Sequence, residues 1–246
     1  ELLSGLVFLR PLGLRLWAGS QKYGALVWSG DIKSSFPSMK NQVAAGLNMG
    51  IAGIPWWTTD IGGFFGANIN DPEFHELLIR WFEYGCFCPV MRLHGYRWPL
   101  QPQYGTTGGA TCVSGAPNEV WSYTDQVCEI LSDYLRLRER MLPYITELME
   151  EAHEKGTPVM RPLFYDFPED KESWNVETEY MFGPKVLVKP ITDADARETD
   201  VYLPGGASWT NAWTGETFEG GQKVHVAAPI EQIPLFTRDG YKLPMK

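Results

Sequence analysis

Two short apolar runs, each followed closely by an aspartate, constrain the fold of this chain more than any other feature. Residues 25–28 form the first run and lead to Asp31, and residues 53–59 form the second and lead to Asp60. The segment between them predicts a helix, with Ser34 or Ser35 as its cap and Gly50 as its stop. This strand–helix–strand order has the size of a parallel crossover. Both aspartates are therefore expected at one rim of a parallel sheet.

The next elements continue the α/β pattern up to about residue 155. Asp71-Pro72-Glu73 combines a cap, a first-turn proline and an early acid, which predicts a helix start. Residues 86–95 predict a third strand that ends near His94, and residues 95–117 predict a long loop. Residues 118–155 are expected to be helical, with a kink or a break at Pro143.

After Gly156 the sequence changes character. Apolar β-rich runs (VMRPLFYDF, VLVKPI, DVYLPGG, KVHVAAP and QIPLFTRDG) alternate with turn dipeptides such as Asp239-Gly240. We therefore expect residues 156–246 to form an antiparallel β-sandwich. The preceding 155 residues are too few for a closed (β/α)8 barrel, which needs roughly 250. The predicted fold class is α/β followed by all-β, with either a small open sheet or part of a TIM barrel in the first region.

The composition excludes several kinds of partner. A net charge of −9 argues against nucleic acid and anionic membranes, and no apolar run is long enough to span a membrane. Cys86 and Cys88 are one residue too close for the usual metal-binding pair, so the four cysteines are expected to be buried free thiols, which favours a reducing compartment. The sequence predicts no metal site, and it contains no phosphate loop, dinucleotide fingerprint or Ser-His-Asp order that would indicate a cofactor or a hydrolytic triad.

Carboxylates between aromatic residues are typical of glycoside cleavage, in which one carboxyl group protonates the leaving oxygen. Asp31, Asp60 and His94 are the candidates, and Trp28, Trp56, Trp57 and Phe64 flank them. Purely structural roles remain open for two of these residues: Asp60 could cap a turn, and His94 could be a hydrogen-bonded structural histidine. Trp209 and Trp213 are expected in the core of the β region, although sugar binding is an alternative.

Several motifs resemble glycoside hydrolase family 31, the retaining α-glucosidases and α-xylosidases. They are AGSQKYG, WSGD at 28–31, GIPWWTTDIGGF at 53–64, PEFHELLIRWFEYG, RLHG at 92–95, RERMLPY at 138–144 and GTPVMRPLFYDFP at 156–168. The resemblance implies part of a (β/α)8 barrel followed by a proximal β-sandwich. It implies that Asp31 is the general acid/base, that His94 hydrogen-bonds the sugar and that Trp28 lines the cleavage subsite. Asp60 corresponds to a family aspartate near that subsite, and we add Trp57 and Phe64 as candidate substrate-binding residues.

Two departures from the family pattern concern the beginning of the chain. In the family, the nucleophilic aspartate lies upstream of the AGSQ stretch, and a sugar-contacting arginine would fall on Leu14, one place from Arg15. We therefore interpret residues 1–16 as aberrant, residues 1–155 as the C-terminal half of the barrel, and the N-terminal part as missing.

The resulting expectation is that a longer parent hydrolyses terminal α-glucosides or α-xylosides with retention. Its partner would be a glycoside or oligosaccharide, and whether it is a homo-oligomer is left open. This chain alone is expected to be inactive and poorly soluble. The alternative is a non-catalytic fragment that binds sugar or completes a barrel; an α-galactosidase of similar architecture explains WSGD and RLHG less well.

Overall fold

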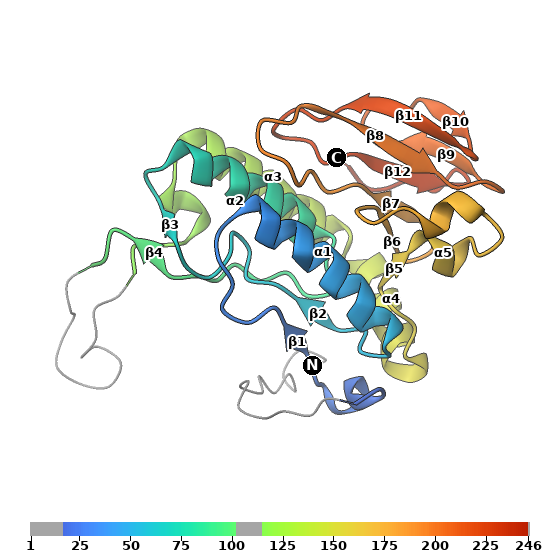
Figure 1. The fold of residues 1–246 in the computed structure, drawn as a ribbon, viewed down its shortest axis with the longest axis horizontal. Coiled ribbons are helices and arrows are strands. Elements are labelled where there is room, and N and C mark those ends of the chain that lie inside the picture. Colours follow the sequence, from blue (N-terminus) through green and yellow to red (C-terminus); the bar gives the residue numbers. More distant parts are fainter. Residues whose placement is uncertain (1–16, 102–114, 246) are drawn as a thin grey trace.

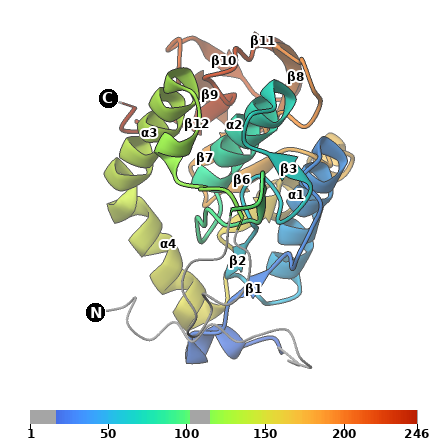
Figure 2. The same ribbon diagram turned by 90° about the vertical axis from the view of Figure 1, so that its left-hand side faces the viewer.

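The computed structural model describes residues 17–101 and 115–245 (Figure 1). The first region consists of very short strands surrounded by long helices. Its elements are η1 (Ser20–Tyr23), β1 (Val27–Trp28), α1 (Phe36–Ile51), β2 (Trp57–Thr58), β3 (Ala67–Asn68), α2 (Pro72–Cys86), β4 (Arg97–Trp98), η3 (Val120–Ser122), α3 (Asp125–Arg140) and α4 (Leu142–Lys155). In Figure 2, β1 and β2 lie between α1 on one side and α4 on the other.

The predicted parallel crossover is present. β1 and β2 pair in parallel, with Val27 opposite Trp57 and Trp28 opposite Thr58. α1 connects the two strands and starts as expected, because the Ser35 side chain accepts a hydrogen bond from the backbone N–H of Ser38. The two strands therefore end at the same rim.

The predicted third strand, residues 86–95, was wrong for most of its length. α2 continues through Cys86, and in the rest of this segment the structure shows a single parallel bridge between Ile61 and Leu93. Pro89 has no N–H to donate to a ladder, and Arg138 already binds the carbonyl groups of Cys86, Cys88 and Pro89. A short parallel pair that the sequence did not indicate, β3 with β4, lies instead at the edge of the predicted loop.

The predicted helices are present with shifted ends: α1 runs one residue past its predicted stop at Gly50, and the run predicted from residue 118 becomes α-helical at Asp125. Asp71 caps α2, and Pro72 is its first residue. The run after residue 118 splits next to Pro143: α3 ends at Arg140, and α4 begins at Leu142. Gly156 ends α4 in the left-handed conformation, which a glycine adopts without strain.

The second region is an antiparallel β-structure, as predicted. Its elements are β5 (Met160–Pro162), α5 (Leu163–Asp166), η4 (Lys171–Trp174), β6 (Tyr180–Phe182), β7 (Val186–Val188), β8 (Glu198–Leu203), β9 (Ser208–Asn211), β10 (Thr217–Glu219), β11 (Gln222–Ala227) and β12 (Leu235–Arg238). One sheet has the order β10-β9-β12-β7-β6-β5, and β11 pairs with β8 in a second sheet. The sheets enclose a core that contains Trp209, which confirms the predicted core role of that residue. The run VMRPLFYDF contains α5 and is therefore only partly strand.

A charged cluster joins the two regions. The Arg80 side chain on α2 is fully buried and donates hydrogen bonds to the carbonyl groups of Ala196, Ala228 and Pro229 and to the Glu83 carboxylate. The Glu83 carboxylate also accepts a hydrogen bond from the Tyr134 hydroxyl on α3. Burial raises the pKa of Glu83 to about 8 against the opposing effect of the Arg80 charge. The β-sandwich is thus attached to α2 and α3 by groups that water does not reach.

The cysteines in the described residues are free thiols. Cys86 and Cys88 are buried free thiols, Cys128 is half-buried and free, and Cys112 lies outside the described residues. Burial raises the pKa of the Cys86 and Cys88 thiols to about 12. Residues 1–16, interpreted above as aberrant, also lie outside. In residues 17–101 and 115–245 we find no helix with the length and apolar character of a membrane span.

We predict that Arg80→Met destabilises the chain by about 3–5 kcal/mol, because the buried carbonyl groups of Ala196, Ala228 and Pro229 and the carboxyl group of Glu83 lose the donor that Arg80 supplies. Urea unfolding followed by tryptophan fluorescence measures the change. The double variant Arg80→Met/Glu83→Leu should recover only the part of the loss that comes from Glu83, since the three carbonyl groups still lack that donor. A single variant within about 1 kcal/mol of the wild type, in the range of an exposed pair, would contradict this account.

Candidate active site

The loop that carries Asp31 is tied directly to the loop that carries Asp60. The carbonyl oxygen of Ile32 accepts hydrogen bonds from the backbone N–H groups of Phe64, at 2.7 Å, and Phe65, at 3.2 Å. Gly63 makes this approach possible, because a Cβ atom there would lie 2.6 Å from the Cα atom of Ser34 and its φ is +75°. Asp31 itself is exposed at the rim.

Asp60 is the buried carboxylate of the rim. Its side chain has no exposed surface, and one of its oxygens lies 3.0 Å from Nη1 of Arg92. Burial raises the pKa of Asp60 to about 6; the Arg92 charge opposes the increase, and the Asp31 charge adds to it. The coupling to Asp31 is electrostatic evidence that both predicted carboxylates belong to one cluster.

Arg92 connects this carboxylate to an aromatic wall. Its guanidinium carbon lies 5.9 Å from the ring centroid of Trp28, within the range of a cation–π interaction. Trp28 is half-buried. Because Trp28 pairs with Thr58 across the two strands, these two side chains face the same side of the sheet.

His94 and Phe64 form a second aromatic group at the rim. Their ring centroids are 5.6 Å apart and the rings are tilted by 39°. Burial, followed by the positive charge of Arg92, lowers the pKa of His94, while the Asp31 charge raises it. A neutral imidazole at neutral pH can both donate and accept a hydrogen bond, which suits a hydroxyl partner.

Trp57 differs from the other predicted site residues. Its side chain is 3% exposed, and a Cβ atom on Gly46 of α1 would lie 2.8 Å from the indole. Successive strand residues face opposite sides, so Trp57 points to the helix layer and Thr58 to the interior. This burial assigns Trp57 to the core beneath α1, and we leave it out of the proposed site.

Two arginines that the sequence analysis did not include take part in the site. Arg92 lies in the RLHG motif and pairs with Asp60. Arg97, in what was predicted to be a loop, donates hydrogen bonds to the carbonyl groups of Ile61 and Gly63. An Arg three residues after His94 is a weak signal, since nothing in the local pattern indicates that it is buried.

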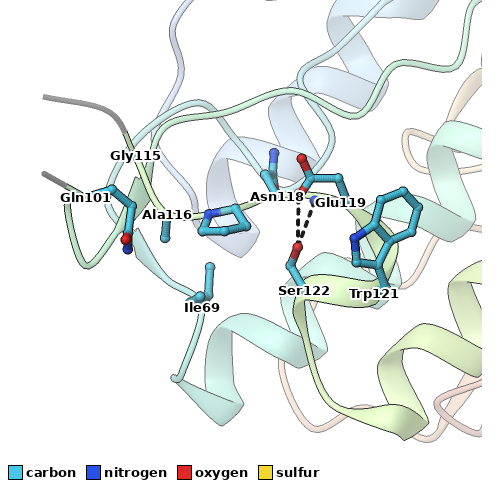
Figure 3. A pocket seen from close by; sticks show the side chains of 9 residues that line it. Ile69, Gln101, Gly115, Ala116, Asn118, Glu119, Trp121 and Ser122 are labelled. Carbon is cyan, nitrogen blue, oxygen red and sulfur yellow. Dashed lines mark hydrogen bonds between the residues drawn. The ribbon is translucent and has the colours of Figure 1, made fainter. Parts of the chain in front are cut away.

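A wide hollow of about 710 Å³ lies beside the rim (Figure 3). It is lined by Ile69, Gln101, Gly115, Ala116, Pro117, Asn118, Glu119, Trp121 and Ser122. Figure 3 shows the Ser122 hydroxyl bound to Glu119, so these polar groups satisfy each other. None of the predicted site residues lines this hollow. Among the described residues no group of three or more His, Cys, Asp or Glu side chains could hold a metal ion.

Comparison with known families identifies the family of this chain. The model for the "Glycosyl hydrolases family 31 TIM-barrel domain" matches residues 12–148, and the model for the "Glycosyl hydrolase family 31 C-terminal domain" matches residues 156–243. The chain belongs to glycosyl hydrolase family 31. Its architecture is therefore part of the family's TIM barrel, followed by the family's C-terminal β-domain.

Individual family 31 proteins resemble the chain over nearly all its length. A solved α-xylosidase from a soil metagenome, complexed with xylose, is 54% identical with a TM-score of 0.88, and the match covers 92% of this chain and 34% of that chain. An α-xylosidase from Saccharolobus solfataricus is 38% identical over 93% of this chain and 29% of its own length. An α-glucosidase 2 from Bacillus thermoamyloliquefaciens is 35% identical over 91% of this chain and 26% of its own length. The family 31 chain thus spans about a third of these relatives or less.

We predict that Asp60 makes the stability of the chain fall as pH rises from about 4 to 6. The folded state holds a proton on Asp60 up to about pH 6, whereas the unfolded state releases it near 3.8, so ionisation of the buried group costs stability in this window. The stabilisation is complete below pH 3.8 and is lost as pH passes through 6. The total is at most about 3 kcal/mol.

Urea unfolding of the wild type and of Asp60→Asn at each pH measures this contribution, because the asparagine variant cannot titrate. The wild type should lose stability relative to Asp60→Asn as pH rises through the window. A difference that stays constant with pH would show that Asp60 does not titrate there. The matched variant Arg92→Met should move the window to higher pH, since it removes the opposing charge.

Proposed function

We propose that this family 31 chain is part of a retaining α-glycosidase that hydrolyses terminal α-xylosidic or α-glucosidic bonds, with Asp31 as the general acid/base. The observation that carries the proposal is the exposed position of Asp31 at a rim where the next residue, Ile32, binds the backbone of Phe64 and Phe65 and where Asp60 pairs with Arg92. In parallel barrels this rim is the catalytic end. The xylosidase and glucosidase relatives described above support the same reaction class.

Asp31 is suited to moving protons because leaving groups and water can both reach it. In the first step its proton passes to the glycosidic oxygen as the bond to the anomeric carbon breaks. In the second step the carboxylate takes a proton from the water that attacks the glycosyl–enzyme intermediate. His94 would hydrogen-bond sugar hydroxyl groups, and Trp28 and Phe64 would contact the apolar faces of the sugar.

Asp60 is poorly suited to be the nucleophile. It is fully buried, it is paired with Arg92, and its raised pKa favours the neutral form in acid. A retaining enzyme needs a second carboxylate about 5 Å from the acid/base. The family resemblance assigns that role to an aspartate upstream of the AGSQ stretch. We therefore propose that Asp60 shapes the subsite and that another part of the protein supplies the nucleophile.

We further propose a domain boundary at about residue 155, with a different role on each side. Residues 1–155 would contribute the catalytic end of the barrel, and residues 156–246 would form the proximal β-sandwich that supports its helices. The choice between xylose and glucose depends on side chains that complete the subsite. Turnover of aryl α-xyloside, α-glucoside and α-galactoside by the parent protein tests the proposed sugars and the weaker alternative together.

We predict that Asp31→Ala in the parent protein lowers kcat/KM about 10²–10⁴-fold for substrates with a poorly acidic leaving group. The loss should be much smaller for a nitrophenyl glycoside, whose leaving group needs little protonation. Steady-state kinetics over a series of aryl leaving groups measures this dependence. Asp200→Asn, an exposed carboxylate on β8, is the matched control and should leave kinetics unchanged. Equal losses across the series would exclude Asp31 as the acid.

We predict that the pure chain by itself does not turn over an aryl α-xyloside or α-glucoside, because the covalent intermediate needs the second carboxylate. The parent's preceding barrel segment, co-expressed as a separate polypeptide, should restore turnover with retention, read by NMR of the first-formed sugar anomer. Turnover by the isolated chain would refute the assignment of the nucleophile. Sugar binding without turnover in the combined sample would favour the non-catalytic alternative.

A further inference from the structure

The Arg97 side chain occupies the centre of the rim without being exposed to solvent. Its guanidinium donates hydrogen bonds to the carbonyl oxygens of Gly63, at 2.7 Å, and Ile61, at 3.1 Å, through two different nitrogens. Its Nε donates to the side-chain oxygen of Asn118 at 3.1 Å. Longer contacts of 3.5 Å reach the carbonyl oxygens of Phe64 and His94. One side chain thus binds three separate segments.

Two of these segments carry the candidate site residues. The segment 60–64 holds Asp60 at its start and Phe64 at its end, and Arg97 binds carbonyl groups between them. The segment 92–97 holds Arg92 and His94. The backbone joins the segments through an isolated parallel bridge between Ile61 and Leu93, which includes the hydrogen bond from Ile61 N–H to the Arg92 carbonyl at 3.3 Å, and through Tyr96 N–H to the Phe64 carbonyl. Without Arg97, the carbonyl groups of Ile61 and Gly63 would lose the donor that the structure provides.

The surrounding sequence leaves space for the guanidinium. A Cβ atom on Gly95 would collide with the guanidinium nitrogens, and one on Gly62 would lie 2.9 Å from Nη2. The guanidinium carbon lies 4.9 Å from the ring centroid of Phe74 on α2, so the planar group is supported from below. These small residues and the aromatic ring form a cradle that fits a flat, forked cation.

The third segment belongs to the wall of the hollow in Figure 3. Asn118 accepts hydrogen bonds from Arg97 and from the Tyr123 hydroxyl, and the N–H of Ala116 donates to the carbonyl oxygen of Arg97 at 2.9 Å. The hollow and the rim are therefore held by the same residue.

We propose that Arg97 is a positioning residue that fixes His94 and Phe64 relative to the Asp31–Asp60 pair. The proposal rests on the proposed function for its catalytic consequence, but its structural part is independent of activity. Lysine cannot replace arginine here, because a single ammonium group cannot bind carbonyl groups at separate places along two segments.

The test compares Arg97→Lys with Arg80→Lys in this chain. Arg80 is the matched control, because it is equally buried and also binds several carbonyl groups, but it lies at the interface with the sandwich. Thermal unfolding is expected to shift to lower temperature in both variants. NMR titration of the His94 ring protons separates them, with His225 on β11 of the sandwich as an internal reference.

In Arg97→Lys we expect a changed titration of His94 and loss of the ring-to-ring nuclear Overhauser effect between Phe64 and His94, with the His225 signal unchanged. Arg80→Lys should leave His94 as in the wild type. Since the lysine variant keeps the positive charge, a His94 signal identical to the wild type in Arg97→Lys would overturn the proposal. Should Arg97→Lys not fold, Arg97→Gln takes its place, because its single amide group cannot donate to the carbonyl groups of both Ile61 and Gly63 in the observed way. An unchanged His94 signal in that variant would equally overturn the proposal.

In the parent protein, Arg97→Lys should lower kcat/KM about 100-fold, the cost of misplacing reacting groups by about 1 Å, while Arg80→Lys should retain most activity at temperatures where it is folded. An altered His94 signal in a parent that has no glycosidase activity would preserve the positioning role and refute the proposed function. Full activity of Arg97→Lys would refute the positioning role alone.

Discussion

Three arginine side chains, two of them fully buried, bind backbone carbonyl groups in segments that lie outside regular secondary structure. The strands of the first region have only two residues each, so their ladders satisfy few carbonyl groups. Arg97 binds the segment after β2, Arg138 binds the segment after α2, and Arg80 binds the segment before β12. A guanidinium has five donors in a rigid plane, so one side chain can do what several backbone donors would do in a longer sheet.

These arginine contacts explain how the rim can have little regular secondary structure and still hold its loops in one conformation. Asp31 is exposed and free to meet a substrate, whereas Asp60 is enclosed and paired with Arg92. The two carboxylates therefore experience opposite environments although each follows a strand of the same parallel pair. Two carboxyl groups in different environments have different pKa values. Chemically identical groups can therefore take different roles in one site.

Local signals predicted the helices of this chain well, because each depends on a few adjacent residues. The Ser35 cap, the Asp71-Pro72 start and the Gly156 stop act through hydrogen bonds and dihedral angles within one turn. The third strand failed because the pattern could not show that Arg138, some fifty residues later, binds the carbonyl groups of that segment.

The site was predictable to the same extent and for the same reason. The position of Asp31 and Asp60 after two paired strands follows from the parallel crossover. His94 instead follows an isolated bridge at Leu93. The roles that the family resemblance implies for these residues stay predictions. The inward or outward direction of Trp57 did not follow, since adjacent residues in WWTT alternate between two faces and the sequence does not say which face is which. Arg97 was missed because burial of a charged residue depends on a cradle made by residues far from it in sequence.

The helix α2 contacts both the β-sandwich and the rim, through side chains on different turns. Arg80 and Glu83 bind the sandwich and α3. Phe74, nearer the start of the helix, supports the guanidinium of Arg97, and Leu78 lies where Gly62 leaves room. The hydrogen bonds from Arg97 to Ile61 and Gly63 do not pass through Arg80. The two rim segments are therefore held by local contacts, and the sandwich contributes no candidate catalytic side chain.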